Sequence, residues 1–296
     1  MHLVECHHST TRSRLVSFTR NHSFRSQNIT RYTRTAIVTM SSSSMHFTNT
    51  RGETLVGSLV QGRTTPKKIV LLCHGYTSNK NSCRFAEIAD GLADAGMSSF
   101  RFDHPCAVGG ESQRLGEFRM GNHDDEVDDI HCAVEFLRHE GYDVVCLLGH
   151  SKGGTNVIKY SSEHGDVPRV VNLAGRFQPM NGLEKRFGDN ILETLKTHGP
   201  QERTEPWGTW TMRYDDFIER AELPMEMYAA TIKEAGRVTL LSIHGRDDTT
   251  IDYTESERCA EIVGGECIVI EGGDHNFTSD VSARDMIRHV VAFATV

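Results

Sequence analysis

The sequence predicts an α/β fold built on a mostly parallel, doubly wound sheet with a helical cap insertion. Short apolar runs of strand length alternate with segments of helical spacing, which is typical of a parallel sheet with helices on both faces. This alternation breaks once, between about residues 175 and 235. The 296 residues, 38% of them hydrophobic, are enough for one large core and a small inserted domain.

The alternation starts with a hairpin, in which residues 46–48 and 54–60 flank the turn sequence Asn-Thr-Arg-Gly. The segment 67–73 is mostly apolar, as expected of a strand covered on both faces. The segment 123–140 has helical spacing and opens with several acidic residues, which suit the positive end of a helix dipole. The other elements expected in this half are strands at 98–102, 144–148 and 169–174 and helices at 84–95 and 153–164.

Residues 175–235 contain no convincing strand, and we expect short helices there at 182–187, 191–198, 214–221 and 225–234. The alternation then resumes with strands at 238–243 and 266–270 and helices at 253–263 and 281–293. The predicted organisation is a core at 46–175, a helical cap at 176–235 and the rest of the core at 236–296. A cap inserted after the strand at 169–174 is expected over the carboxyl ends of the strands, where ligands bind in open α/β sheets.

The first 45 residues differ from the rest, with six arginines, one acidic residue and sixteen serines or threonines. Arg-rich, Ser-rich and acid-poor composition is typical of an organelle transit peptide, whereas a secretory signal would need an apolar stretch. Two other interpretations stay open: a disordered tail, or untranslated sequence ahead of a start at Met40 or Met45. We expect an intracellular protein, in the cytoplasm or, if the extension is a transit peptide, in a chloroplast or mitochondrion.

The composition excludes several classes of function. The formal net charge is −8 without a basic stripe, which argues against a nucleic-acid partner. No apolar run approaches the ~18–20 residues of a membrane span. The eight cysteines form no CxxC pair, and we expect reduced, buried thiols. The sequence has no P-loop, no GxGxxG and no metal-spaced cluster, so neither a cofactor nor a metal is expected.

The strongest motif is Gly149-His150-Ser151-Lys152-Gly153, which fits G-x-S-x-G between an apolar strand and a helix. In this context the motif is a nucleophile elbow: a sharp turn exposes the serine above the sheet of an α/β-hydrolase fold. Small residues two places before and after the serine let the strand and the helix approach closely. We therefore expect Ser151 to be the nucleophile, while the alternative is an ordinary glycine-rich turn.

A serine hydroxyl needs a base that removes its proton, and the chain offers sixteen histidines. His275 follows the last apolar strand and comes after the acid, as the chain order of this fold requires. His244 precedes the acid, and His150 adjoins the serine and cannot face it. The orienting acid is expected after the strand at 238–243, where Asp247 and Asp248 both remain candidates.

The oxyanion hole requires two backbone N–H donors. One donor is expected from Lys152, the residue after the nucleophile. The other is expected from the loop after the strand at 67–73, where Gly75 permits a tight turn and Tyr76 follows it.

These motifs together resemble those of the α/β-hydrolases grouped with serine aminopeptidase-like lipases and esterases, above all plant members and then bacterial cinnamoyl and feruloyl esterases. The resemblance covers residues 46–296 and rests on the segments 74–80, 100–103, 110–112, 149–154, 174–177, 244–248 and 271–275. It implies Ser151 as nucleophile, His275 as base and Asp248 as acid, because the acid of the family lies three positions after the glycine of His-Gly. It also points to the N–H groups of Tyr76 and Lys152 as the oxyanion hole. Peptidase activity is not expected.

Two segments leave the substrate open. Relatives usually have a small, polar turn where this chain has residues 104–109, so His104 or Cys106 either narrows the pocket or packs outward. Apolar residues of the cap either line a pocket or pack the cap against the core. These are Phe187, Trp207, Trp210, Tyr214, Phe217, Met225, Met227 and Tyr228.

The sequence thus predicts a serine hydrolase that cleaves a small-molecule carboxylic ester of small or medium acyl or aryl size, through an acyl-enzyme on Ser151. Dehalogenases and epoxide hydrolases of this fold use an aspartate at the elbow, so the serine argues against both. The alternatives are a thioesterase or amidase with the same residues, a lyase or transferase, and a slow-turnover receptor for a small molecule.

Overall fold

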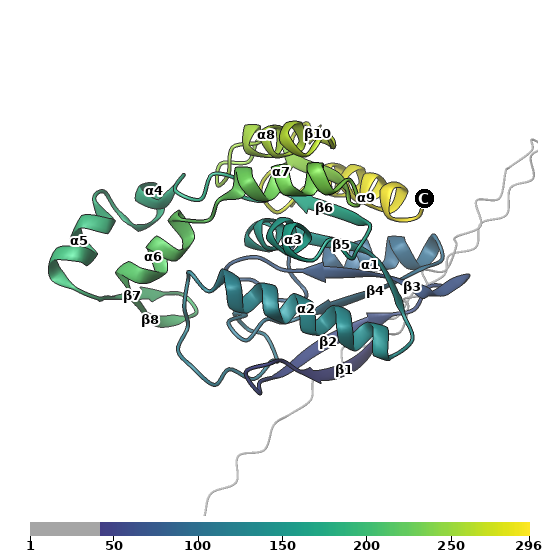
Figure 1. Cartoon of the computed structure of the whole chain (residues 1–296), viewed down its shortest axis with the longest axis horizontal. Helices are drawn as coiled ribbons and strands as arrows, with labels where there is room; N and C mark the ends of the chain where they lie inside the picture. Colours follow the sequence, from purple (N-terminus) through teal and green to yellow (C-terminus); the bar gives the residue numbers. More distant parts are fainter. Residues whose placement is uncertain (1–41) are drawn as a thin grey trace, which may run out of the picture. The chain divides into compact units, whose positions relative to one another are not determined.

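The computed structural model describes residues 42–296, which form an eight-stranded sheet flanked by helices (Figure 1). The strand order is β1-β2-β4-β3-β5-β6-β9-β10. The strands β3 to β6, β9 and β10 run parallel, whereas β2 is antiparallel to both β1 and β4. The strands are β1 Ser43–Thr48, β2 Thr54–Val60, β3 Thr65–Cys73, β4 Met97–Phe102, β5 Asp143–His150, β6 Arg169–Leu173, β9 Thr239–Gly245 and β10 Glu266–Ile270.

The helices beside this sheet confirm the predicted alternation. They are α1 Phe85–Asp94, α2 His123–His139, α3 Lys152–Glu163, α7 Met225–Ala235, α8 Thr254–Val263 and α9 Asp280–Ala294. Within residues 42–296, no helix is long and apolar enough to cross a membrane. The predicted extension at 1–45 falls outside the described residues as far as residue 41, and β1 begins at Ser43.

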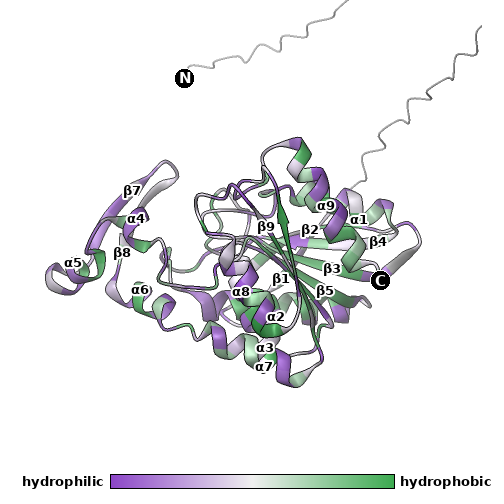
Figure 2. Ribbon diagram, turned by 90° about the horizontal axis from the view of Figure 1, so that it is seen from above, coloured by the Kyte–Doolittle hydropathy of each residue, from purple (hydrophilic) through white to green (hydrophobic). Residues whose placement is uncertain are grey.

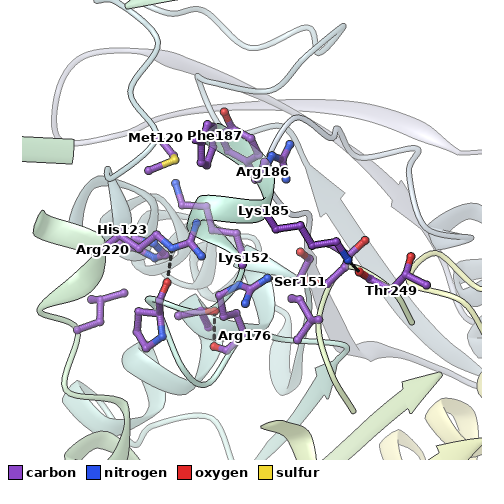
Figure 3. A pocket seen from close by; sticks show the side chains of 17 residues that line it. Met120, His123, Ser151, Lys152, Arg176, Lys185, Arg186, Phe187, Arg220 and Thr249 are labelled. Carbon is purple, nitrogen blue, oxygen red and sulfur yellow. Dashed lines mark hydrogen bonds between the residues drawn. The ribbon is translucent and has the colours of Figure 1, made fainter. Parts of the chain in front are cut away.

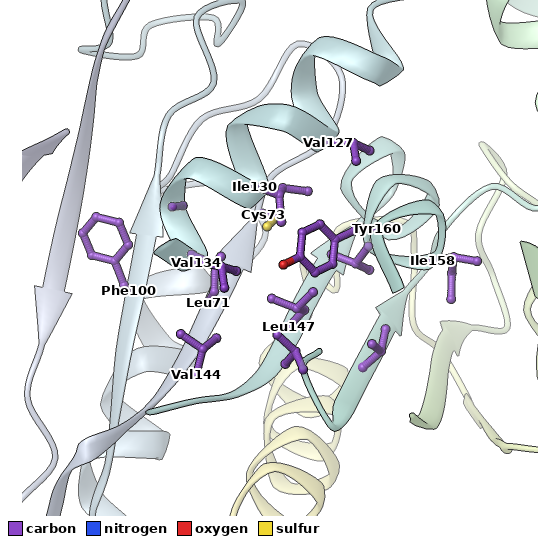
Figure 4. Packing of buried hydrophobic residues seen from close by; sticks show 14 of the residues in the cluster. Leu71, Cys73, Phe100, Val127, Ile130, Val134, Val144, Leu147, Ile158 and Tyr160 are labelled. Carbon is purple, nitrogen blue, oxygen red and sulfur yellow. The ribbon is translucent and has the colours of Figure 1, made fainter. Parts of the chain in front are cut away.

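Successive side chains of β3 point to opposite faces of the sheet and so join two separate apolar clusters. Leu71 packs in the cluster that contains residues of α2, α3, α7 and α8, and Figure 4 shows it near Ile130 and Tyr160. Leu72 packs in the other cluster, with residues of α1 and α9 such as Phe85 and Met286. Because both faces are covered, the central strands are apolar almost throughout, which made them recognisable from the sequence.

The cap differs from its prediction, because it contains a two-stranded antiparallel sheet as well as helices. Its elements are α4 Leu183–Phe187, α5 Ile191–His198, β7 Gln201–Glu205, β8 Gly208–Met212 and α6 Tyr214–Ala221. The expectation that this region has no strand is therefore wrong. The reason is that β7 is polar, as its purple colour in Figure 2 shows, and therefore lacks the apolar run on which the prediction relied. Its side chains are also half or fully exposed.

The helix α7 lies within the predicted cap range but packs on α3 and α8. Its side chains Met225, Ala229 and Ile232 belong to the same apolar cluster as the central sheet. The cap elements instead bury Phe187, Trp210 and other residues in a cluster of their own.

Candidate active site

The turn between β5 and α3 carries Ser151 in a conformation that side chains rarely adopt, with φ of 56°. The neighbouring glycines permit this turn. A Cβ atom on Gly149 would lie 2.1 Å from the carbonyl oxygen of Gly153, and one on Gly153 would lie 2.2 Å from that of Cys73. The strand and the helix therefore approach closely only because both positions are glycine, as the elbow motif predicts.

The structure brings Ser151, His275 and Asp248 together from three separate loops. The His275 Nε2 atom lies 3.1 Å from the Ser151 Oγ atom, and the His275 Nδ1 atom lies 2.7 Å from the Asp248 Oδ2 atom. The Asp248 side chain is fully buried, whereas Asp247 is exposed. Of the two acids that spacing left open, only Asp248 contacts the histidine.

The environment of Asp248 favours its charged form. Burial alone would raise the pKa of Asp248, but hydrogen bonds from His244 and His275 outweigh burial and hold the pKa below its usual range. The second oxygen, Oδ1, accepts the backbone N–H groups of Thr250 and Ile251 at 2.7 and 2.9 Å. The carboxylate is thus fixed in orientation and ionised at neutral pH.

Two histidines that sequence analysis excluded as the base, His244 and His150, contact the candidate triad. His244 is fully buried, with Nε2 2.9 Å from Asp248 Oδ2 and Nδ1 2.7 Å from the Ser256 hydroxyl. The His150 Nε2 atom donates to the backbone carbonyl of His275 at 2.9 Å. Burial, and then the charge of His275, lower the pKa of His150 to about 3, so it is a neutral support for the His275 loop. The contact between His244 and Asp248 was not predicted, although the four-residue spacing between them was a signal that could have indicated it.

The two expected oxyanion-hole residues lie on adjoining turns. Lys152 begins α3, and Tyr76 follows β3 after Gly75. A Cβ atom on Gly75 would lie 2.9 Å from Ser151 Cβ and 3.4 Å from the backbone nitrogen of Lys152, so the two turns are in contact. The Lys152 side chain forms a buried ion pair with Glu126 at 2.9 Å, which anchors the first turn of α3 to α2.

A pocket of about 380 Å³ opens above Ser151 (Figure 3). Its walls come from the β3 loop, the start of α2, the cap helices α4 and α6 and the loop after β9. The apolar part of the lining consists of Met120, Phe187, Leu223 and Ile251. This volume suits a small organic ligand.

The sequence left open whether several residues line the pocket or pack in the interior, and most of those described below pack in the interior. His104 is buried and its Nδ1 atom lies 3.1 Å from Asp129, while Cys106 packs against the cap cluster. Neither lines the pocket above Ser151. Among the cap aromatics, Phe187 lines the pocket, whereas Trp210 and Phe217 are buried in the cap cluster.

Within residues 42–296, no group of three or more His, Cys, Asp or Glu side chains is arranged to hold a metal ion. The seven cysteines of this range are all unpaired.

Comparison with known proteins bears on the family and the fold of this chain. A family model described as serine aminopeptidase, S33, matches residues 64–282, which is more than half of the chain. A search of curated proteins found no match.

Solved structures with the same fold include proteins named as esterases or hydrolases. Est1E from Butyrivibrio proteoclasticus, bound to ferulic acid, is 17% identical with a TM-score of 0.67, over 84% of this chain and 97% of that one. The Pyrococcus furiosus esterase Pf2001 is 20% identical with a TM-score of 0.62, over 86% and 90%. The α/β hydrolase GrgF from Penicillium sp. is 14% identical with a TM-score of 0.68, over 86% and 98%. At these identities the likeness establishes the α/β-hydrolase fold, and the family model adds that this chain belongs to the serine aminopeptidase S33 family.

Proposed function

We propose that this protein is a serine hydrolase that cleaves a carboxylic ester through an acyl-enzyme on Ser151. The observation that carries the proposal is the continuous series of contacts from Ser151 Oγ to His275 Nε2, at 3.1 Å, and from His275 Nδ1 to Asp248 Oδ2, at 2.7 Å. Nucleophile, base and orienting acid each lie within hydrogen-bond distance of the next, which is the geometric requirement for this chemistry.

In the proposed mechanism, His275 Nε2 takes the proton of Ser151 Oγ as this oxygen attacks the ester carbonyl. Asp248, ionised and buried, accepts the Nδ1–H of His275 and stabilises the imidazolium that forms. The backbone N–H groups of Tyr76 and Lys152 stabilise the oxyanion. His275 then protonates the leaving alcohol, and a water molecule activated by the same nitrogen hydrolyses the acyl-enzyme.

An ester of small or medium size fits the pocket best. Its volume of about 380 Å³ and its apolar lining by Met120, Phe187 and Leu223 suit a short acyl chain or one aromatic ring. The fold neighbours named as esterases, one of them holding ferulic acid, agree with this size class.

The test is hydrolysis of p-nitrophenyl esters, from acetate to octanoate, by the full-length protein. Replacement Ser151→Ala is expected to lower kcat/KM by about 10³-fold or more, as for the loss of a triad nucleophile. The matched control is Ser162→Ala, a partly exposed serine on the same helix, which should leave the rate within about twofold. Equal rates in the wild type and Ser151→Ala would contradict the proposal, as would no turnover of any ester.

A further inference from the structure

The pocket above Ser151 is strongly cationic although the chain as a whole carries a formal charge of −8. Five basic side chains line it from four parts of the chain: Lys152, Arg176, Lys185, Arg186 and Arg220. No aspartate or glutamate of residues 42–296 lines the same pocket. The excess positive charge is therefore local and not a property of the whole surface.

Two of the five cations are balanced by buried carboxylates behind the pocket wall. Lys152 pairs with Glu126 at 2.9 Å. Arg176 lies 3.4 Å from Glu255, whose oxygens also accept the backbone N–H groups of Phe177 and Gln178 at 2.8 Å each. Glu255 is thus shared among several donors and compensates Arg176 only partly.

The other three cations have no carboxylate partner among the described residues. The Arg220 Nε atom donates to the carbonyl of Pro179 at 2.6 Å, and Lys185 Nζ donates to that of Thr249 at 2.8 Å. Arg186 lies over the aromatic ring of Tyr76, 4.5 Å from its centre. Neutral carbonyls and rings orient these groups but leave their charges in place.

The guanidinium groups also act on one another. Burial, and then the charges of Arg176 and Arg186, lower the pKa of Arg220. Figure 3 shows Arg176, Arg186 and Arg220 among the side chains around the pocket. Holding these like charges close together costs free energy. A bound anion would offset that cost, because it attracts the guanidinium groups.

The backbone contacts preorganise the two arginines for such a ligand. Arg176 donates to the carbonyls of Asn181 and Thr250, at 2.7 and 2.9 Å, and Arg220 donates to Pro179. Each guanidinium carries five N–H groups, and the described contacts leave N–H groups of both free. In Arg220 the Nη1 atom has no partner among the described residues, and fixed guanidinium groups bind carboxylate and phosphate with high specificity.

We infer that the substrate of this site is an anionic ester, in which a carboxylate or phosphate group binds Arg176 and Arg220 while the ester carbonyl lies at Ser151. Lys185 and Arg186, at the exposed edge of the pocket, attract the anion from solution. The inference rests on the proposed ester hydrolysis and adds the substrate class to it. The apolar lining accepts the body of the molecule between the two ends.

The experiment compares esters that differ only in charge, in the full-length protein. On the alcohol side the pair is 4-acetoxybenzoate and 4-acetoxybenzamide, with 4-acetoxyphenyl phosphate as the phosphate arm. On the acyl side the pair is monomethyl adipate and methyl adipamate. In at least one pair we expect kcat/KM to be about 10-fold or more higher for the anion, and this ratio should fall as sodium chloride is raised. The phosphate arm identifies which anion is preferred.

The double replacement Arg176→Gln and Arg220→Gln should abolish this ratio, because it should raise KM for the anion far more than KM for the matching amide. The matched control is Arg213→Gln, a partly exposed cap arginine that pairs with Glu117 and lies outside the pocket. Equal kcat/KM for anion and amide in both pairs would overturn the inference, and so would an anion preference that survives the double replacement.

A binding measurement separates failure of this inference from failure of the proposed function. Calorimetry with the Ser151→Ala protein should give tighter binding of 4-acetoxybenzoate, 4-acetoxyphenyl phosphate or monomethyl adipate than of the matching amide, even if the wild type hydrolyses no ester. Equal or absent binding of anions and amides, together with turnover of p-nitrophenyl acetate, would leave the hydrolase in place and remove the anion site.

Discussion

The central sheet and the cap each bury apolar side chains, but in clusters that differ in extent and in purpose. The sheet fixes Ser151, Asp248 and His275 at the ends of strands that are covered on both faces. The cap has its own small cluster around Phe217 and Trp210 and contributes Lys185 and Arg220 to the pocket. We infer from this difference that the core determines the chemistry of the site and that the cap determines which substrate reaches it.

The largest expected effect comes from the acid in the core. Asp248→Asn should lower kcat by about 10⁴-fold, because the amide cannot hold His275 in the tautomer that accepts the proton of Ser151. Asp247→Asn is the matched control and should stay within about twofold, since Asp247 is exposed. Steady-state kinetics with p-nitrophenyl acetate decide this, and a comparable loss in both variants would refute the assignment of Asp248.

The elbow itself should tolerate no side chain at Gly153. A Cβ atom there would lie 2.2 Å from the carbonyl oxygen of Cys73, so Gly153→Ala is expected to lower the free energy of unfolding by about 1–3 kcal/mol or more and to displace Ser151. Urea denaturation and esterase activity measure the two effects. Gly116→Ala, with open space around its Cβ position, should change stability by less than about 0.5 kcal/mol.

The central sheet could be predicted from the sequence more completely than the cap. Strand β5 and the Ser151 turn were recognisable because a buried parallel strand is continuously apolar and the turn requires glycines. Strand β7 was missed because a polar, half-exposed strand has no continuous apolar run. The contact of His244 with Asp248 was missed because chain order was used to exclude it from the site.

The cationic pocket could not be predicted from local pattern at all. Lys152, Arg176 and Arg220 are separated by tens of residues in the sequence and line one pocket only when the cap folds over the core. Each one alone is typical of a solvated surface residue. Long-range convergence of this kind is set by tertiary packing and leaves no periodic signal.

A comparison of two buried phenylalanines tests whether the cap is a separate folding unit. Both Phe100 in β4 and Phe217 in α6 are fully buried. Phe100→Ala should reduce global stability by about 3–5 kcal/mol, whereas Phe217→Ala should mainly speed amide exchange in β7, β8 and α6. Equal losses of global stability in urea denaturation would show that the cap unfolds together with the core.

A smaller effect is expected for the histidine behind the acid. His244→Leu removes one hydrogen bond to Asp248, so kcat should fall by about 10-fold with KM unchanged. His244→Gln, whose amide can still donate to Asp248, should retain most of the activity. An unchanged kcat in His244→Leu would mean that His244 only packs in the core and does not position Asp248.

The last prediction concerns the pH dependence of stability. Three core histidines have a lowered pKa, and burial is the largest cause in each. The pKa is lowered to about 4 for His74, where the charge of His104 lowers it further, and to about 3 for His123 and His150. In the unfolded chain a histidine ionises near pH ~6.5, so between that pH and the folded pKa the unfolded state binds more protons. Stability should therefore be full above pH ~6.5 and fall by about 1.4 kcal/mol per pH unit per histidine below it.

Urea denaturation between pH 7 and pH 5 measures this slope. His123→Gln should reduce the slope by the contribution of one histidine, whereas the exposed His139→Gln should leave it unchanged. The same slope in all three proteins would contradict a neutral, buried His123.

The most direct test of the central claim is intact-protein mass spectrometry after reaction with a fluorophosphonate, which forms a stable bond to an activated serine and releases fluoride. We expect a single adduct that peptide mapping places on Ser151, that is absent in Ser151→Ala and that forms far more slowly in Asp248→Asn. No adduct on the wild type, or an adduct that persists in Ser151→Ala, would contradict Ser151 as the activated nucleophile.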